Sequence, residues 1–442
     1  MPKRYLPNIR DQYEAYPFPK RDPEQERSRV IASELEMLGK INHFGFAGRQ
    51  SFGPGFRALV AGGGTGDSAI FLAEQLRKRG GRVTYLDLSR TSMETAQARA
   101  AVRNLANIEW VHGSILDLPE MGLAPFDYIN CAGVLHHLAD PDEGLRCLAA
   151  VVKEDGCLGL MVYGRLGRID IYATQELMRH LTAGEPSLAE RVALAKEVLT
   201  RLPPNNILMR GRDRKATLDL LLDDEPNLVD ALLHEQDRAY NVAEIYTWLD
   251  QAGLKLVEFS TYQGLGGVCR LEYDPALYLE GLPVLERVRK LPLPIQQTIA
   301  ESINGSMGLH GFYAAKRAAT IARLDDPAMV PNFLTTHAIE VCRKLAAAGP
   351  EGIAVTLRFE VKYTFRPHPA TQAFLTLIDG QSDMAAILSR LAAMPAVAAQ
   401  GLDRAALMAK LVKDFDILAA LQLVVLRHRD APPIGTIVKS YA

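Results

Sequence analysis

Cysteine is scarce in this chain: there are five in 442 residues, and no two of them stand in a C-x-x-C spacing. Zinc sites built on thiolates use such closely spaced pairs. We therefore expect no metal site on the cysteines, and the sequence predicts no metal ligands elsewhere. Unpaired cysteines are typical of the reduced thiols of cytosolic proteins, so we expect a cytoplasmic protein.

Long apolar runs and an excess of charge are also missing. No stretch approaches the roughly 18–20 apolar residues of a membrane span, and the first 27 residues lack the apolar core of a signal peptide. Lysine and arginine (50) nearly balance aspartate and glutamate (52), and no long basic block appears. We therefore expect no membrane span and no nucleic-acid partner.

Apolar runs of strand length alternate with helical patterns from residue 57 to residue 164. This order predicts an α/β fold with a doubly wound, Rossmann-like sheet and helices on both faces. Mostly helical insertions at about 168–250 and 275–304 interrupt the later strands. A helix is predicted at 142–156, closed by its last glycine. The predicted strands are 57–62, 82–88, 108–113, 126–133, 157–164, 255–262 and 310–317.

Three parts of the chain are predicted. Residues 1–45 form an N-terminal arm and helix, because prolines interrupt the first 26 residues and a helical pattern covers 27–41. Residues 46–322 form the α/β domain. A linker at 324–332 leads to a C-terminal accessory domain at 333–442, which is predicted to be a small α+β fold. This last domain serves recognition or assembly, including a possible homodimer.

The stretch "GGGTG" at 62–66 follows a predicted strand and precedes a helix. By itself it fits the G-x-G-x-x-A variant of a dinucleotide fingerprint, which keeps an NAD(P)-dependent oxidoreductase as one alternative. Short-chain dehydrogenases also need a Tyr-x-x-x-Lys pair on a later helix. The chain has that spacing only from Tyr16 to Lys20, ahead of the fold, so hydride transfer lacks its proton donor.

S-adenosylmethionine (SAM) needs close backbone contact for its methionyl part, a carboxylate for its ribose hydroxyls and an apolar-edged slot for its adenine. "GGGTG" is followed by Asp87 at a strand end, by "GSILDLP" at 113–119, by "VLHHL" at 134–138 and by "DGCLGL" at 155–160. In this order the motifs resemble a class I SAM-dependent methyltransferase over residues 57–164. The resemblance implies the seven-stranded methyltransferase sheet, SAM as cofactor and S-adenosylhomocysteine as product.

The resemblance also implies roles for individual residues. Three glycines would line the methionyl and ribose portion, Asp87 would take the ribose hydroxyls, and residues after the third and fourth strands would flank adenine and the methionine end. Aromatic residues of the arm would cover the pocket. The predicted cofactor residues are Gly62, Gly64, Gly66, Asp87, Leu88, Ser114, Ile115, Asn130 and Tyr16.

Candidate catalytic residues follow the fourth strand. His136 and His137 would lie beside the transferable methyl, where an imidazole can deprotonate a hydroxyl or amine near neutral pH. Tyr172 lies on one predicted helical face with Gln175 and Arg179. A polar cluster around His234 and Asp237 either covers the acceptor pocket or forms an ion-paired helix junction.

The sequence thus predicts a methyltransferase that acts on a protein side chain or on a small molecule. The methylated atom can be N, O or C. A binding module that holds SAM without turnover is a second hypothesis, of a different class.

Overall fold

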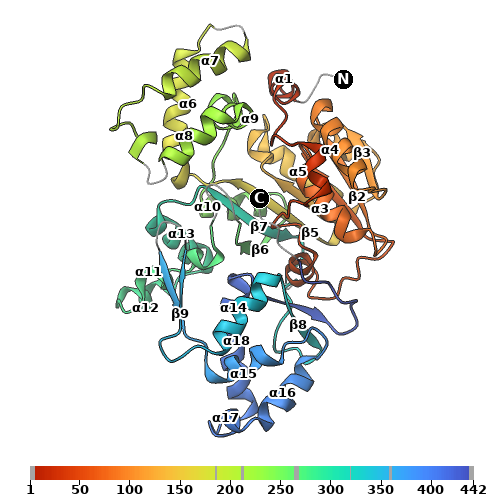
Figure 1. The fold of residues 1–442 in the computed structure, drawn as a ribbon, viewed down its shortest axis with the longest axis vertical. Coiled ribbons are helices and arrows are strands. Elements are labelled where there is room, and N and C mark those ends of the chain that lie inside the picture. Colours follow the sequence, from red (N-terminus) through yellow and green to blue (C-terminus); the bar gives the residue numbers. More distant parts are fainter. Residues whose placement is uncertain are drawn as a thin grey trace.

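The computed structural model describes residues 5–184, 187–210, 214–262, 268–318, 320–357 and 361–437. Its centre is a seven-stranded sheet with the order β3-β2-β1-β4-β5-β7-β6 (Figure 1). Strands β1 to β5 are parallel, and β7 runs antiparallel between β5 and β6. The predicted doubly wound fold is therefore confirmed. The strands are β1 Arg57–Ala61, β2 Arg82–Asp87, β3 Ile108–His112, β4 Phe126–Ala132, β5 Val152–Tyr163, β6 Lys255–Ser260 and β7 Leu309–Ala315.

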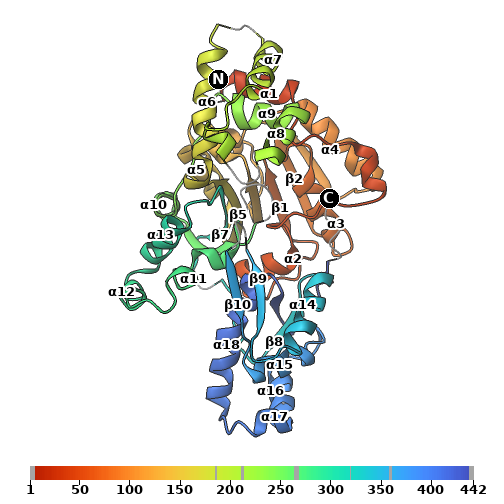
Figure 2. The ribbon, with the colours of Figure 1, turned by 60° about the vertical axis from the view of Figure 1, so that its left-hand side comes forward.

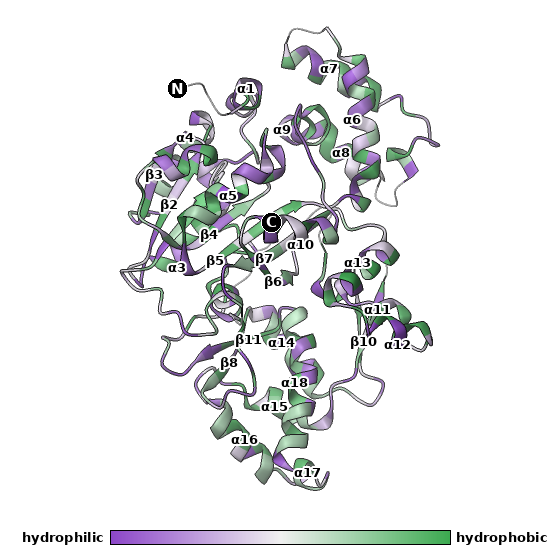
Figure 3. Cartoon of the chain, turned by 180° about the vertical axis from the view of Figure 1, so that it is seen from behind, coloured by the Kyte–Doolittle hydropathy of each residue, from purple (hydrophilic) through white to green (hydrophobic). Residues whose placement is uncertain are grey.

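Helices cover both faces of the sheet. On one face, α5 (Pro141–Val151) and α10 (Val242–Gln251) bury apolar side chains against the strands. On the other face lie α3 (Asp67–Leu76), α4 (Arg90–Val102) and the turn of π-helix η2 (Ile41–Gly45). Strands buried on both faces read as continuous apolar runs, and β5 and β7 carry the hydrophobic colour in Figure 3.

The N-terminal segment differs from the prediction. Helix α1 (Pro7–Ala15) forms inside the proline-rich arm, because its proline stands at the first helical position, where no amide donor is required. The predicted helix at 27–41 is wrong: a 3-10 turn ends at Arg27, and helix resumes only with α2 (Leu38–Lys40). At the start of α2 the Gln75 side chain replaces helical hydrogen bonds. It accepts from the Leu38 amide at 3.1 Å and donates to the Glu36 carbonyl at 2.9 Å.

The boundary between α5 and β5 also differs from the prediction. The helix ends at Val151 and β5 begins at the next residue, so the predicted helix at 142–156 is five residues too long. Gly156 lies within the strand and closes no helix. A Cβ there would stand 2.7 Å from a Val152 methyl carbon and 2.8 Å from the Asp127 carbonyl oxygen. This glycine therefore allows a close backbone approach, as glycines inside strands often do.

The segment after β5 is helical and lies over the end of the sheet at which β4 and β5 terminate (Figure 2). Its apolar side chains form a cluster of their own. We name this segment, residues 166–233, the insertion. A second helical segment stands between β6 and β7. The elements are η5 Leu166–Arg168, α6 Ile169–Leu181, α7 Leu188–Leu199, η6 Leu208–Arg210, α8 Arg214–Asp223, α9 Glu225–Leu228, η7 Val229–Leu233, η8 Arg270–Tyr273, α11 Ala276–Leu279, α12 Val284–Val288 and α13 Leu293–Asn304.

The C-terminal part has a separate apolar core. Its β8 and β11 pair antiparallel, so the predicted linker at 324–332 is too long by the strand residues that begin at Met329. Pro331 favours a loop in the sequence, because proline lacks an amide donor for a sheet. A two-stranded ribbon has a free edge on each strand, and a proline is tolerated there. The elements are β8 Met329–Phe333, α14 Thr336–Ala346, β9 Ile353–Thr356, β10 Lys362–Phe365, α15 Pro369–Leu377, α16 Met384–Ala393, α17 Pro395–Ala398, α18 Arg404–Ala420 and β11 Val424–His428.

The C-terminal part packs on the face of the domain that carries α2 and η2. Leu334 and Val425 share an apolar cluster with Met37 and Phe71, and the Leu426 amide donates to His43 at 3.2 Å. Within the described ranges, no helix combines the length and the apolar character that crossing a membrane requires.

Candidate active site

The turn between β1 and α3 holds glycines in the left-handed region: φ is +77° at Gly62, +50° at Gly64 and +105° at Gly66. Neighbouring atoms also leave no space for a side chain at these positions. A Cβ at Gly62 would lie 2.4 Å from a Val134 methyl carbon, and one at Gly64 would lie 2.7 Å from the Phe18 carbonyl oxygen. The turn therefore presents bare backbone at the start of a helix, where a ligand can approach closely.

Asp87 ends β2 beside this turn. Its Oδ2 accepts from the Gly64 amide at 2.7 Å, and its Oδ1 accepts from the Ser89 amide at 2.8 Å. Burial raises the pKa of Asp87, while the amide donors act in the opposite direction. Ser89 caps α4 by accepting from the Ser92 amide at 3.1 Å. Asp87 is therefore not needed as the cap of α4, and its remaining lone pairs suit two ribose hydroxyls.

The other predicted cofactor residues lie along the same edge of the sheet. Ser114 follows β3 as the cap of η3 (Ile115–Glu120), with Ile115 buried beside it. Leu88 follows Asp87 and is half-buried. Asn130 is buried on β4, and its Nδ2 atom has no hydrogen-bond partner. Their contact with a cofactor stays a prediction.

The N-terminal arm lies across the glycine turn. The Thr65 amide donates to the Phe18 carbonyl at 3.3 Å, and the Ser89 hydroxyl donates to the Tyr13 carbonyl at 3.1 Å. Tyr16, predicted to cover the cofactor, packs against the apolar cluster of the insertion. The arm thus runs from the cofactor residues to the insertion.

Buried ion pairs fasten the arm to the domain. Arg99 lies 2.6 Å from Glu26 and 2.6 Å from Asp67, and Arg21 lies 2.6 Å from the second oxygen of Asp67. The Arg99 and Glu26 side chains are 1% and 2% exposed. Burial raises the pKa of Asp67, but Arg21 and Arg99 outweigh it and hold this pKa below its usual value.

Histidine and carboxylate side chains gather directly after β4. His136 and His137 lie on η4 (Leu135–His137), and both are buried. The insertion side contributes His234, whose ring stacks on that of His137 with centroids 3.9 Å apart, and Asp230, whose Oδ1 lies 3.9 Å from His137 Nε2. The Tyr13 hydroxyl of the arm donates to Asp230 at 2.9 Å. Arm, sheet and insertion therefore meet at the two histidines.

Hydrogen bonds define the neutral form of His137. Its Nδ1 lies 3.1 Å from the Gln236 carbonyl oxygen, so Nδ1 carries the proton and Nε2 has a lone pair. Neither ring nitrogen of His136 has a partner. Burial lowers the pKa of both residues, and at His136 the neighbouring His137 lowers it further. Both imidazoles are therefore neutral at pH 7, and each is a weaker base than a free imidazole.

Tyr172 of α6 reaches the same cluster through Asp237. The Tyr172 hydroxyl donates to Asp237 Oδ1 at 3.2 Å, and the Gln175 amide donates to Oδ2 at 3.2 Å. Burial raises the pKa of Asp237. The cluster predicted around His234 and Asp237 therefore joins the two histidines, and Tyr172 acts in it by positioning a carboxylate.

Sequence analysis missed three residues of this cluster: Tyr163, Arg168 and Asp230. The Arg168 guanidinium carbon lies 3.5 Å from the centre of the Tyr163 ring, and the His136 ring centre lies 3.9 Å from the same ring. The Tyr163 hydroxyl donates to Asp230 at 3.0 Å. No local spacing connects a strand end, a short turn and a later helix, so only the folded chain brings them together.

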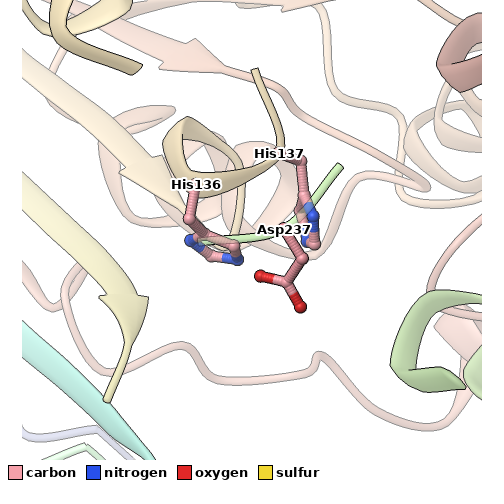
Figure 4. A group of neighbouring side chains, drawn as sticks. All are labelled: His136, His137 and Asp237. Carbon is pink, nitrogen blue, oxygen red and sulfur yellow. The ribbon is translucent and has the colours of Figure 1, made fainter. Parts of the chain in front are cut away.

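The cluster has a ligand set of the kind that binds transition metals. His136, His137 and Asp237 each offer one atom, and these atoms lie within 4.8 Å of one another. Figure 4 shows the three side chains next to one another at the turn after β4. His137, Asp230 and His234 form a second set. In that set the His234 Nδ1 accepts from the Gln236 amide at 3.1 Å, so its Nε2 carries a proton and offers no lone pair.

A cavity of about 320 Å³ adjoins the cluster between α6, α7 and η7. His234 belongs to both its wall and the cluster. Arg179 and Arg191 also line it, together with Glu235. The cavity can therefore hold the part of an acceptor that extends away from the histidines.

Comparison with known proteins agrees with this geometry. Residues 59–158 match a family model described as a methyltransferase domain. An uncharacterized protein of Synechococcus sp. is 31% identical over 272 residues, which cover 59% of this chain and 61% of that protein. A ubiquinone biosynthesis O-methyltransferase of Neisseria meningitidis is 37% identical over 103 residues, covering 23% of this chain and 42% of that enzyme. The chain thus spans less than two thirds of either relative.

Among solved structures, PKMT2 from Rickettsia typhi in complex with AdoHcy has a similar fold. The match covers 90% of this chain and 76% of that chain, with a TM-score of 0.57 and 16% identity. Sheet order, glycine turn and the family match over residues 59–158 together support a class I SAM-dependent methyltransferase domain in this part of the chain.

Proposed function

We propose that this protein transfers the methyl group of SAM to an acceptor atom held at His136 and His137. One observation carries the proposal: Tyr13 contacts both the predicted cofactor residues and the histidine cluster. Its carbonyl accepts from Ser89 beside the glycine turn, and its hydroxyl donates to Asp230 in the histidine cluster. The predicted cofactor residues and the histidines are therefore separated by a single residue of the arm.

The residues at the sheet edge fit the cofactor. Gly62, Gly64 and Gly66 keep the turn as bare backbone, since a Cβ at each would collide with the surrounding chain, and Asp87 beside the turn offers a half-buried carboxylate for the ribose hydroxyls. When bound, SAM supplies an electrophilic methyl group and leaves as S-adenosylhomocysteine. The chain's own task is to hold the acceptor in line at about 3–3.5 Å and to exclude water.

His136 is the proposed base for an acceptor that carries a proton. Both of its ring nitrogens lack partners, so one lone pair is available to the acceptor. His137 is held by the Gln236 carbonyl and presents its Nε2 lone pair, which can orient the same group. Tyr172 holds Asp237 beside them.

Calorimetry with SAM and with S-adenosylhomocysteine, followed by transfer of labelled methyl from SAM into a cell extract, tests this function. We expect binding of both compounds and label in one acceptor fraction, either protein or small molecule. A His136→Ala protein should bind the cofactor and transfer little label. Binding without label in either fraction would instead support the non-catalytic module.

A further inference from the structure

The histidine cluster contains buried polar atoms that have no partner. They are Nε and Nη2 of Arg168, both ring nitrogens of His136 and Nε2 of His137. A buried polar group left unpaired costs about 1–3 kcal/mol, and more when it is charged. So many unpaired atoms in one place indicate that the cluster is complementary to a polar ligand.

The open edge of Arg168 is the edge with which this chain binds carboxylates elsewhere. Arg21 donates from Nε and Nη2 to the two oxygens of Asp67, at 3.0 and 2.6 Å. Arg323 binds Asp325 through the same two atoms, also at 3.0 and 2.6 Å. This two-point geometry matches the planar fork of arginine to a carboxylate.

Among the residues that the structure describes, no carboxylate fills this edge of Arg168. Asp237 comes nearest, with its Oδ2 3.8 Å from Arg168 Nη2, beyond hydrogen-bond distance. That carboxylate is already held by Tyr172 and Gln175. The Arg168 side chain is 15% exposed, but its Nε and Nη2 atoms are themselves buried and have no hydrogen-bond partner.

We propose that the methyl acceptor is a small hydroxy acid, whose carboxylate is bound by the Nε–Nη2 edge of Arg168 and whose hydroxyl lies at His136 and His137. This inference rests on the proposed function and adds the acceptor class. His136 and Arg168 lie against opposite faces of the Tyr163 ring, at 3.9 and 3.5 Å from its centre, because one face has no room for both, so the acceptor must extend around the edge of this ring to reach both. In the adjoining cavity Arg191 is paired with Glu235 at 3.1 Å, which leaves Arg179 as the positive charge that favours an anion there.

The position of Arg168 also bears on the metal-like ligand set. A divalent cation on His136, His137 and Asp237 would share Asp237 with a guanidinium 3.8 Å away. The positive charge of Arg168 beside the same carboxylate disfavours a second cation there. The unpaired donors of Arg168 therefore favour an acid over a cation at this site.

The test compares acids with their neutral amides on the full-length protein saturated with S-adenosylhomocysteine. The probes are 4-hydroxybenzoate against 4-hydroxybenzamide and lactate against lactamide, measured by calorimetry. Wild-type protein should bind at least one acid about 10- to 100-fold more tightly than its amide, the factor expected for charge-assisted hydrogen bonds. Arg168→Gln should abolish this preference and Arg168→Lys should keep part of it. Arg165→Gln should keep all of it, because Arg165 is 48% exposed and paired with Glu244.

Each other outcome overturns the inference. It is wrong if no acid binds more tightly than its amide, including the case in which neither binds, or if the Arg168→Gln protein keeps the preference. It is also wrong if EDTA removes the preference and Zn²⁺ restores it, since that result would assign the cluster to a metal. Absence of S-adenosylhomocysteine binding at the first step would instead contradict the proposed function itself.

Discussion

Replacing Asp87 with asparagine should weaken SAM binding without harming the fold. In the described structure the carboxylate accepts from two amides, Gly64 at 2.7 Å and Ser89 at 2.8 Å. An asparagine side chain keeps only one acceptor oxygen and carries no charge. Losing one charge-assisted partner to the ribose costs about 1.5–3 kcal/mol, which corresponds to a Kd roughly 10- to 150-fold higher. Calorimetry with SAM measures this change directly.

The stability of the same variant should change little, because two effects of the substitution oppose each other. Burial holds the pKa of Asp87 above its usual value, so the charged form is disfavoured in the folded, ligand-free protein. This penalty is present at pH values above the raised pKa, and asparagine removes it. Asparagine also leaves one of the two amides without an acceptor, and this loss opposes the gain, so we expect only a small change in the midpoint of thermal unfolding at pH 7. For the same reason, wild-type affinity for SAM should fall as the pH is lowered toward that pKa, whereas the variant should show a flatter profile.

Glu94→Gln, an acid-to-amide change at an exposed position of α4, is the matched control and should leave both quantities unchanged. SAM affinity within twofold of wild type in a folded Asp87→Asn protein would refute the assignment of Asp87 to the ribose. A large fall in the unfolding midpoint at pH 7 would refute the argument that removal of the partly buried charge offsets the lost hydrogen bond.

Three further changes test other parts of the site. Gly64→Ala places a side chain at φ +50° with its Cβ 2.7 Å from the Phe18 carbonyl oxygen. The backbone strain alone should destabilise the protein by about 1–2 kcal/mol, and displacement of the arm should speed its cleavage by chymotrypsin. Unchanged cleavage would contradict the contact between the arm and Gly64. His136→Ala should lower kcat about 10²-fold or more with SAM affinity retained; full activity from pH 6 to 8 would exclude a base at this position. Arg99→Met leaves Glu26 buried without its main partner and should destabilise the protein by about 3–5 kcal/mol in urea unfolding. A loss below 1 kcal/mol would show that Arg103, 3.4 Å from Glu26, suffices.

The sheet and the cofactor edge could be predicted from the sequence because their signals are local. Each strand is a short apolar run, and the glycine turn and Asp87 belong to adjacent elements. Helix α1 was missed because its proline stands at the first helical position, where it does not interrupt a helix, and the segment at 27–41 was predicted wrongly because a long-range partner decides part of it. Gln75 in α3 satisfies the backbone at Glu36 and Leu38, and no pattern within the segment reveals that contact.

The acceptor side of the site was only partly predictable. His136 and His137 stand out because they are adjacent and follow a strand. Arg168 and Asp230 have no such signal, since a lone arginine before a helix and a lone aspartate on a helix usually face solvent. Only the packing of the insertion on the sheet shows that the guanidinium edge is buried and unpaired.

The position of Tyr13 also has a thermodynamic consequence. One residue contacts Ser89 through its carbonyl and Asp230 through its hydroxyl, so any ligand that shifts the arm changes both contacts at once. Linkage then requires the two ligands to influence each other by the same factor. The affinity for an acceptor should depend on whether S-adenosylhomocysteine is bound, and the affinity for S-adenosylhomocysteine should depend equally on the acceptor. Because Tyr13 contacts both parts of the site, the cofactor and the acceptor should bind in a fixed order. The compound that lies deeper under the arm should bind first and leave last.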